Sequence, residues 1–288
     1  MSLKLFTHMF KVMGGPAELQ LYLQNNDTAI FQLAENEARR LEKKYSRYLD
    51  NSITNTINAS AGNKKGMDVD DETTALLNYA SVAWAQSDGL FDITSGVLRK
   101  AWNFTSNQLP KQEQLNELLT NVGWDKLKWN PPHLTLSANM EIDFGGIVKE
   151  YAADAMTAIL RNAGVQHGLV DLAGDIGIIG PHPDGAPWKI GIRNPEKTQT
   201  AIATLDAYNG GIASSGNYER FMIVNGSRYC HILNPKTGWP VNGVTAASVH
   251  ASTCMVAGTA TTTAMLLGAA KGRSWLEEGG FNHLLLEE

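Results

Sequence analysis

The stretch Ile142-Asp143-Phe144-Gly145-Gly146-Ile147-Val148-Lys149 predicts a strand end, two glycines and a helix start. The helix it begins is predicted to span residues 145–162, with Gly164 as its stop. Backbone N–H groups at a helix start lack intrahelical partners, so together with Lys149 they would suit a pyrophosphate. The alternative is a glycine turn followed by a solvated lysine. The stretch alone leaves both interpretations open.

Helices are predicted mainly before this stretch. The first has apolar residues spaced by three and four, at Ala34, Ala38, Leu41, Tyr45 and Tyr48. A second helix starts at Asp70-Asp71 and stops near Gly89, and a third covers about residues 110–121.

Strands are predicted at the N-terminus and in the second half of the chain. Leu19, Leu21 and Leu23 alternate with polar residues after the turn at 14–16, and further strand signals cover 134–142, 175–179 and 188–192. Asn225-Gly226 predicts a tight hairpin that pairs Met222 with Tyr229. Because the predicted helices come mainly early in the chain and the predicted strands mainly late, the pattern favours the α+β class over regular βαβ alternation. No repeat or linker interrupts the chain, which predicts one domain over residues 1–288.

Composition excludes several classes of protein. The 288 residues are 43% hydrophobic and 18% charged, an ordinary globular mixture. Lys plus Arg is 24 and Asp plus Glu is 29, so the net charge of −5 argues against a nucleic-acid partner. Two cysteines are too few for a disulfide scaffold. The first twelve residues show no secretory signal pattern, and we expect a cytoplasmic protein.

The longest uncharged stretch, residues 251–270, has the length of a membrane span. It contains five threonines, one serine and two glycines, with little Leu, Ile or Phe. We therefore expect a buried helix of small residues and no transmembrane segment.

Familiar short motifs do not fit this chain. Gly174, Gly177 and Gly180 miss the dinucleotide-binding spacing, and Asn217 stands where a phosphate-binding loop needs lysine. No histidine pair has metal-ligand spacing. The remaining candidates are polar, glycine-rich segments where the predicted secondary structure changes.

Seven such segments, in this order, resemble the ApbE family of FAD:protein FMN transferases over nearly the whole chain. They are Ser46-Arg47-Tyr48, residues 52–58, Leu90-Phe91-Asp92-Ile93-Thr94, residues 142–149, Gly174-Asp175-Ile176, residues 214–218 and residues 231–238. The resemblance implies a T-fold-like α+β fold, with a mixed or antiparallel sheet, helices and a central flavin cleft. It also implies Mg²⁺-dependent transfer of FMN from FAD to a threonine hydroxyl of a target flavoprotein, with release of AMP.

The same resemblance implies which residues form the site. The FAD-binding residues would be Met13, Tyr48, Leu90, Phe91, Asp92, Asp143, Lys149 and Ile232. Core packing is the alternative role for Met13, Tyr48 and Phe91. His231 would be the general base and Lys149 would supply positive charge to the phosphates. For His231, the alternative is a core histidine bonded to Asn234 or to a backbone carbonyl.

The implied Mg²⁺ site departs from the family pattern. Its ligands here would be the Gly146 carbonyl and the Thr262 hydroxyl, but Gly258 stands where the family has an aspartate. Because Mg²⁺ prefers carboxylate oxygens, this loss predicts weaker binding, unless another carboxylate such as Asp143 contributes. Restoring an aspartate at position 258 is expected to raise the affinity.

Two milder departures are Asn234 in place of an aspartate and Ser214 in place of a threonine. Without the aspartate, protonated His231 is less favoured. Two other functions therefore stay open, an FAD carrier or sensor that does not transfer FMN, and an FAD hydrolase that gives FMN and AMP.

Overall fold

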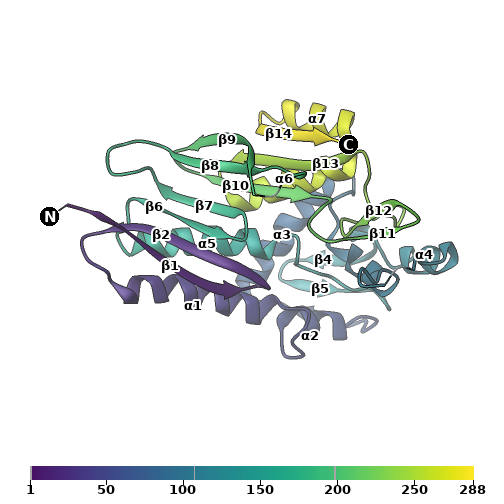
Figure 1. Cartoon of the computed structure of the whole chain (residues 1–288). Helices are drawn as coiled ribbons and strands as arrows, with labels where there is room; N and C mark the ends of the chain where they lie inside the picture. Colours follow the sequence, from purple (N-terminus) through teal and green to yellow (C-terminus); the bar gives the residue numbers. More distant parts are fainter. Residues whose placement is uncertain (1, 107, 198) are drawn as a thin grey trace.

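The main structural element is a seven-stranded antiparallel sheet (Figure 1). The computed structural model describes residues 2–106, 108–197 and 199–288. In spatial order the strands are β1 (Lys4–Val12), β2 (Gly15–Leu23), β6 (Gly168–Leu172), β7 (Asp175–Gly180), β10 (Gly211–Gly216), β13 (Val244–Ala251) and β14 (Asn282–Glu287). The main apolar core draws side chains from Val12 to Leu285. The single domain over residues 1–288 stays a prediction.

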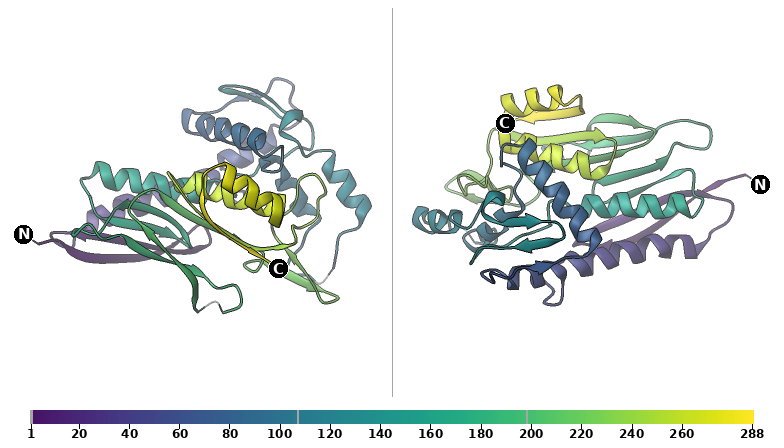
Figure 2. Two further views of the ribbon diagram at one scale, coloured as in Figure 1. Left: turned by 90° about the horizontal axis from the view of Figure 1, so that it is seen from above. Right: turned by 180° about the vertical axis from the view of Figure 1, so that it is seen from behind.

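Helices cover one face of this sheet, as the view from behind in Figure 2 shows. They are α1 (Thr28–Tyr45), α5 (Val148–Asn162) and α6 (Cys254–Leu267), while α7 (Ala269–Glu278) packs on α6 and β14. A ribbon of β8 (Trp188–Arg193) and β9 (Ala201–Ala207) contributes Trp188 and Ala207 to a second apolar cluster with Ile176, Ile178 and Ile212.

Alternation along β7 decides which side chains face the helices. Ile176 and Ile178 pack with Trp188 of the ribbon. Asp175 and Gly177 therefore point the other way, toward α5. A Cβ atom at Gly177 would lie 2.4 Å from Thr157 Oγ1, so α5 can approach the strand only because glycine stands there. This close packing brings the start of α5 beside Asp175.

A second group of elements lies at the right-hand end of the molecule in Figure 1. It contains α2 (Ile53–Ala59), α3 (Asp71–Gln86), α4 (Gln112–Leu119), the 3-10 helices η1 (Ile93–Lys100) and η2 (Trp124–Lys126), the sheet of β3 (Met67–Asp68), β5 (His133–Thr135) and β4 (Lys128–Asn130), and the hairpin of β11 (Phe221–Val224) and β12 (Ser227–Cys230).

The predicted α+β class is confirmed, and three predicted boundaries are corrected. The first helix ends at Tyr45, because the chain turns extended at Ser46, so Tyr48 lies outside it. The strand predicted over 134–142 is only the short β5. Helix α5 begins at Val148 rather than 145, since residues 145–147 form a turn.

Two further predictions are confirmed. The hairpin has the predicted register, with Met222 opposite Tyr229. The uncharged stretch at 251–270 contains the largely buried helix α6. In the described parts of the chain, no helix combines the length and hydropathy that crossing a membrane would require.

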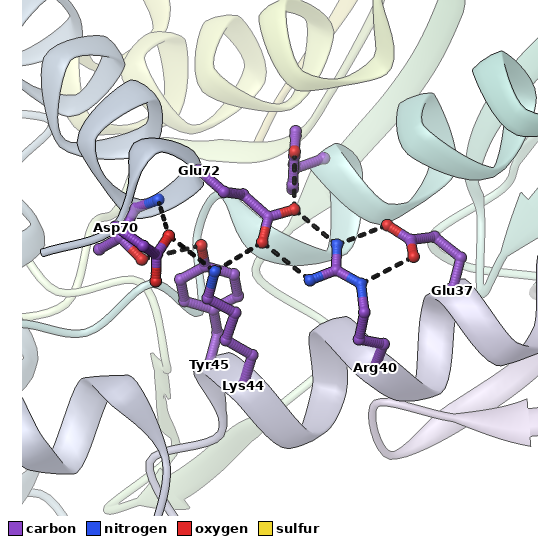
Figure 3. Close-up of polar contacts among 8 residues, drawn as sticks. Glu37, Arg40, Lys44, Tyr45, Asp70 and Glu72 are labelled. Atoms are coloured by element: carbon purple, nitrogen blue, oxygen red, sulfur yellow. Dashed lines mark hydrogen bonds and ion pairs between the residues drawn. The ribbon is translucent and has the colours of Figure 1, made fainter.

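A network of charges ties α1 to α3 and α5 (Figure 3). Glu72 accepts from both Arg40 and Lys44, at 2.6 and 2.8 Å, and from the Tyr151 hydroxyl at 3.0 Å. Arg40 also pairs with Glu37 at 2.6 Å, and Lys44 with Asp70 at 2.8 Å. Hydrogen bonds from Arg40 are the main reason that the pKa of Glu72 falls to about 2.

Glu72→Gln is expected to lower the free energy of unfolding at pH 7 by about 1–2 kcal/mol, because two cations lose their shared carboxylate. The folded-state pKa of Glu72 is about 2, below its ordinary value of 4.5. The stabilisation is therefore present above about pH 4.5 and lost as the pH falls toward 2. Urea unfolding at several pH values measures the difference, with the exposed Glu117→Gln as the control. Equal free energies at pH 7 would contradict it.

Candidate functional site

The start of α5 leaves backbone groups without helical partners. Ile147 and Val148 donate to the Phe144 carbonyl, each at 2.9 Å, and Tyr151 donates to the Ile147 carbonyl at 2.9 Å. The Gly146 carbonyl accepts no backbone hydrogen bond from the described residues. Both glycines of the turn are exposed. The N–H groups of Lys149 and Glu150 donate to no backbone carbonyl of the described residues, so they are the donors that an anion at this helix N-terminus could use.

Lys149 forms an ion pair in the first turn of α5. Its Nζ lies 2.6 Å from Asp175 Oδ2, and the exposed fractions of the two side chains are 36% and 4%. Burial by itself would lower the pKa of Lys149, but the charge of Asp175 outweighs it and the pKa is raised. Lys149 is therefore a charged group anchored to a buried carboxylate. The alternative of a simple solvated lysine is wrong.

Asp143 is held in place from two sides. Arg47 forms an ion pair with its carboxylate, and the Gly145 N–H donates to Oδ1 at 2.9 Å. Arg47 also donates to the Tyr48 hydroxyl at 2.7 Å and lies over that ring, 4.9 Å from its centroid. Tyr48 is 76% exposed, so core packing does not explain it. The arrangement offers a flat aromatic surface beside a fixed carboxylate.

The structure explains why residues 52–58 accompany this site. Asn58 pairs with the backbone of Ile142 in both directions, donating to its carbonyl at 3.0 Å and accepting from its N–H at 2.7 Å. The Asp143 N–H donates to the Ile93 carbonyl at 2.8 Å. Helix α2 and the start of η1 together fix the chain just before the two glycines.

Phe91, which lies between Leu90 and Asp92 in the chain, is beside the glycine turn. A Cβ atom at Gly146 would lie 3.7 Å from the Phe91 ring, and Phe91 is 5% exposed. Asp92 is buried and caps η1, accepting from the Thr94 N–H at 2.8 Å and the Trp124 N–H at 3.0 Å. Leu90 is half-buried. The Asp92 carboxylate is thus committed to protein donors.

A pocket of about 480 Å³ also contacts Asp92. Its other walls include Trp84, Asp88, Val122 and Lys236. It contains no other residue of the predicted FAD set. We therefore do not assign this pocket to FAD, and the central flavin cleft stays a prediction.

Met13 lies in the turn between β1 and β2, and Ile232 lies two residues after β12. Met13 adopts a positive φ of 52° between β1 and β2, and its N–H donates to Glu42 Oε1. Ile232 accepts from the Val241 N–H at 3.0 Å. Both are half-buried against the main core, so their packing role is visible and their FAD role stays a prediction.

His231 follows β12 and is bonded to a backbone carbonyl. Its Nδ1 lies 3.2 Å from the Arg220 carbonyl oxygen, and its own N–H donates to the same oxygen at 2.9 Å. Asn234 instead accepts from the Lys236 N–H at 2.8 Å. Because the carbonyl can only accept, Nδ1 of His231 carries the hydrogen, and Nε2 of the neutral ring is then unprotonated. Burial chiefly, and the charges of Arg220 and Lys149 further, lower the pKa of His231.

The predicted metal ligand Thr262 lies on α6 and faces strand β10. Thr262 Oγ1 of α6 is 3.3 Å from Ser215 Oγ of β10, and Thr261 Oγ1 is 2.8 Å from the same atom. Ser214 points to the other face, where its hydroxyl pairs with that of Ser248 at 2.7 Å. The serine that replaces a threonine is therefore not the one that faces Thr262.

Sequence reasoning missed Glu150, which lies against Gly258. A Cβ atom at Gly258 would be 2.6 Å from Glu150 Cγ and 2.8 Å from Oε1. The expected gain of metal affinity in Gly258→Asp stays a prediction, but an aspartate there would require the Glu150 side chain to move. Asp143 pairs with Arg47, and its contribution to a metal site also stays a prediction.

The ionisation of Glu150 reflects these surroundings. Burial, and then the negative charge of Asp175, raise the pKa of Glu150 above its ordinary value. Its Oε2 atom is buried and has no hydrogen-bond partner among the described residues. Within those residues, no group of three or more His, Cys, Asp and Glu side chains could hold a metal ion. A cation here would need backbone, hydroxyl and substrate oxygens besides one carboxylate.

The fold and this site together define the chain's class, an antiparallel α+β protein with a lysine-bearing helix start and a carbonyl-bonded histidine. The model of the ApbE family matches residues 13–285, and the chain belongs to that family. The ApbE protein of Thermotoga maritima has a TM-score of 0.91 and 27% identity, over 99% of this chain and 94% of that one. The flavinyl transferase ApbE of Pseudomonas stutzeri gives 0.89 and 26%, over 100% and 92%.

Curated sequences agree with the structural similarity. The FAD:protein FMN transferase of Vibrio cholerae is 28% identical over 223 residues, which are 73% of this chain and 65% of that protein. The match to the protein of the same name from Escherichia coli covers 59% of its length. The matched region is thus about three fifths of these two relatives.

Proposed function

We propose that this protein is an FAD:protein FMN transferase. It moves FMN from FAD to a threonine hydroxyl of a target flavoprotein and releases AMP. The observation that carries the proposal is the Lys149–Asp175 pair at the open start of α5, in the electrostatic reach of His231. Relatives that carry this name are 28% identical to this chain over 73% and 68% of its length.

Each residue has a distinct task in the proposed reaction. Lys149 and the backbone at the start of α5 hold the nonbridging oxygens of the pyrophosphate. The threonine oxygen forms a bond to the phosphorus of the FMN half, and the bond from this phosphorus to the AMP phosphate oxygen breaks. His231 accepts the hydroxyl proton on Nε2. The product is a phosphodiester on the target protein.

The FAD contacts in this proposal follow the predicted set. Tyr48, held by Arg47, offers a ring face for stacking, and Asp143 offers a fixed acceptor. In this proposal the margins of the FAD site are formed by Met13, Leu90, Phe91 and Ile232. Asp92 acts indirectly by capping η1. A divalent cation, Mg²⁺ by this proposal, would neutralise phosphate charge, with Gly146 and Thr262 as oxygen ligands.

The experiment mixes the protein with FAD, Mg²⁺ and a flavoprotein subunit that carries the acceptor threonine. Mass spectrometry is expected to find one FMN added to the subunit, together with an equal amount of AMP. Absence of the adduct at every divalent metal concentration would reject the proposal. AMP without adduct would identify an FAD hydrolase, and bound FAD without AMP a carrier or sensor.

A further inference from the structure

The Glu150 side chain lies where the side chain of an aspartate at position 258 would begin. Helix α6 lacks a side chain at position 258, and the Glu150 side chain of α5 fills the space that a Cβ atom there would need. The closest approach is 2.6 Å, from the Glu150 Cγ to that Cβ position. The carboxylate that α6 does not provide is thus supplied by α5 at the same point of contact.

Helical spacing aligns this contact with the other two oxygen donors. Gly146 precedes Glu150 by four residues, in the turn before α5, and Thr262 follows Gly258 by one turn of α6. One turn away on the other side, Asp154 of α5 accepts from the Cys254 N–H of α6 at 2.8 Å. The two helices therefore run in opposite directions past the contact between Glu150 and Gly258, and the Gly146 and Thr262 ends lie toward the same side of it.

The donor chemistry fits a hard divalent cation. The Gly146 carbonyl receives no backbone hydrogen bond from the described residues. The Oε2 atom of Glu150 is buried and has no hydrogen-bond partner among those residues. Lys149 is paired with Asp175 and does not neutralise that oxygen by a hydrogen bond. Mg²⁺ and Mn²⁺ take carboxylate, carbonyl and hydroxyl oxygens, together with phosphate oxygens of a substrate.

We propose that Glu150 is the carboxylate ligand of the divalent cation in this protein, acting with the Gly146 carbonyl and the Thr262 hydroxyl. The inference rests on the proposed function for the presence of FAD phosphates beside the cation. It differs from the sequence-based expectation, in which the loss of an aspartate at 258 weakens the site. In this proposal the site keeps one carboxyl ligand, which comes from α5 instead of α6.

Mn²⁺ binding measured by electron paramagnetic resonance tests the inference without any turnover. The full chain is titrated with Mn²⁺ in saturating FAD, and the signal of free Mn²⁺ gives the dissociation constant. Glu150→Gln is expected to weaken binding by about 10- to 100-fold, because it removes the charge and keeps the shape. FAD binding measured by flavin fluorescence in EDTA is expected to stay within about threefold. The control is Glu72→Gln, which lies outside the site and is expected to keep the Mn²⁺ affinity.

A paired exchange tests the geometry. Gly258→Asp alone is expected to bind Mn²⁺ no more tightly than the wild type and to melt at a lower temperature, because Glu150 occupies the space. Glu150→Ala with Gly258→Asp is expected to recover Mn²⁺ binding to within about fivefold of the wild type. This double variant also serves if Glu150→Gln does not fold.

Three results would overturn the inference: wild-type Mn²⁺ affinity in Glu150→Gln, a gain of affinity in Gly258→Asp alone, or no Mn²⁺ uptake by the wild type with FAD bound. None of these measures FMN transfer. If transfer to the acceptor subunit proceeds while Glu150→Gln binds Mn²⁺ normally, the ligand assignment fails and the proposed function stands. If FAD does not bind at all, the proposed function fails instead.

Discussion

His231→Ala is expected to slow FMN transfer by about 10²- to 10⁴-fold while the affinity for FAD stays nearly constant. The imidazole is oriented by the Arg220 carbonyl at Nδ1, which leaves Nε2 to accept the threonine proton. Single-turnover rates at saturating FAD measure the loss, and flavin fluorescence measures the affinity. His250→Ala is a matched control, because His250 is also bonded to a carbonyl, that of Asn209 at 2.8 Å.

The pH dependence distinguishes a base from a packing residue. Burial lowers the pKa of His231 below its ordinary value of 6.5, so the neutral ring persists at pH 6.5 and above. The wild-type rate is therefore expected to stay level above pH 6.5 and to fall as the pH drops through the lowered pKa. In His231→Ala this inflection is expected to vanish. A variant that keeps the inflection, or a loss below about tenfold, would show that His231 is not the base.

Lys149→Met is expected to have two effects that can be separated. It leaves the Asp175 carboxylate, which is 4% exposed, without its cation. Removing one partner of a buried ion pair costs about 3–5 kcal/mol, and because the Lys149 side chain is 36% exposed, we expect about 2–3 kcal/mol of unfolding free energy. FAD affinity is expected to fall at least about tenfold with the phosphate contact, measured by fluorescence titration.

The double variant Lys149→Met with Asp175→Asn separates the two effects. Stability is expected to return to within about 1 kcal/mol of the wild type, because no uncompensated charge is left. FAD affinity is expected to stay low. Recovery of FAD binding along with stability would contradict the phosphate role and leave Lys149 as a structural partner of Asp175.

Local signals in the sequence predicted a turn whose conformation depends on neighbouring residues. The turn at Asn225-Gly226 is set within a few residues and is found as expected. The two glycines before Lys149 were expected inside the helix, but they form a turn and α5 begins at Val148. Tyr48 shows the limit, since its spacing continued the helical pattern after the helix had ended at Tyr45. An apolar period does not reveal where a backbone turns extended.

Contacts between distant segments were not predictable in this way. Arg47 lies 96 positions from Asp143 and carries no signal of that pairing. Asp92 is a residue type that often binds ligands, but here it caps a helix. Only the hydrogen-bond donors around its carboxylate show this role. No sequence signal distinguished Glu150 from the other charged residues of its helix. Only the packing of α5 on α6 places it over Gly258.

The steric conflict between positions 150 and 258 makes the two substitutions interdependent in evolution. A side chain at 258 needs space that Glu150 now fills, so the effect of a substitution at either position depends on the residue at the other. A comparison that judges position 258 alone would register only a missing aspartate. Under the proposed assignment, positions 150 and 258 have to be scored together.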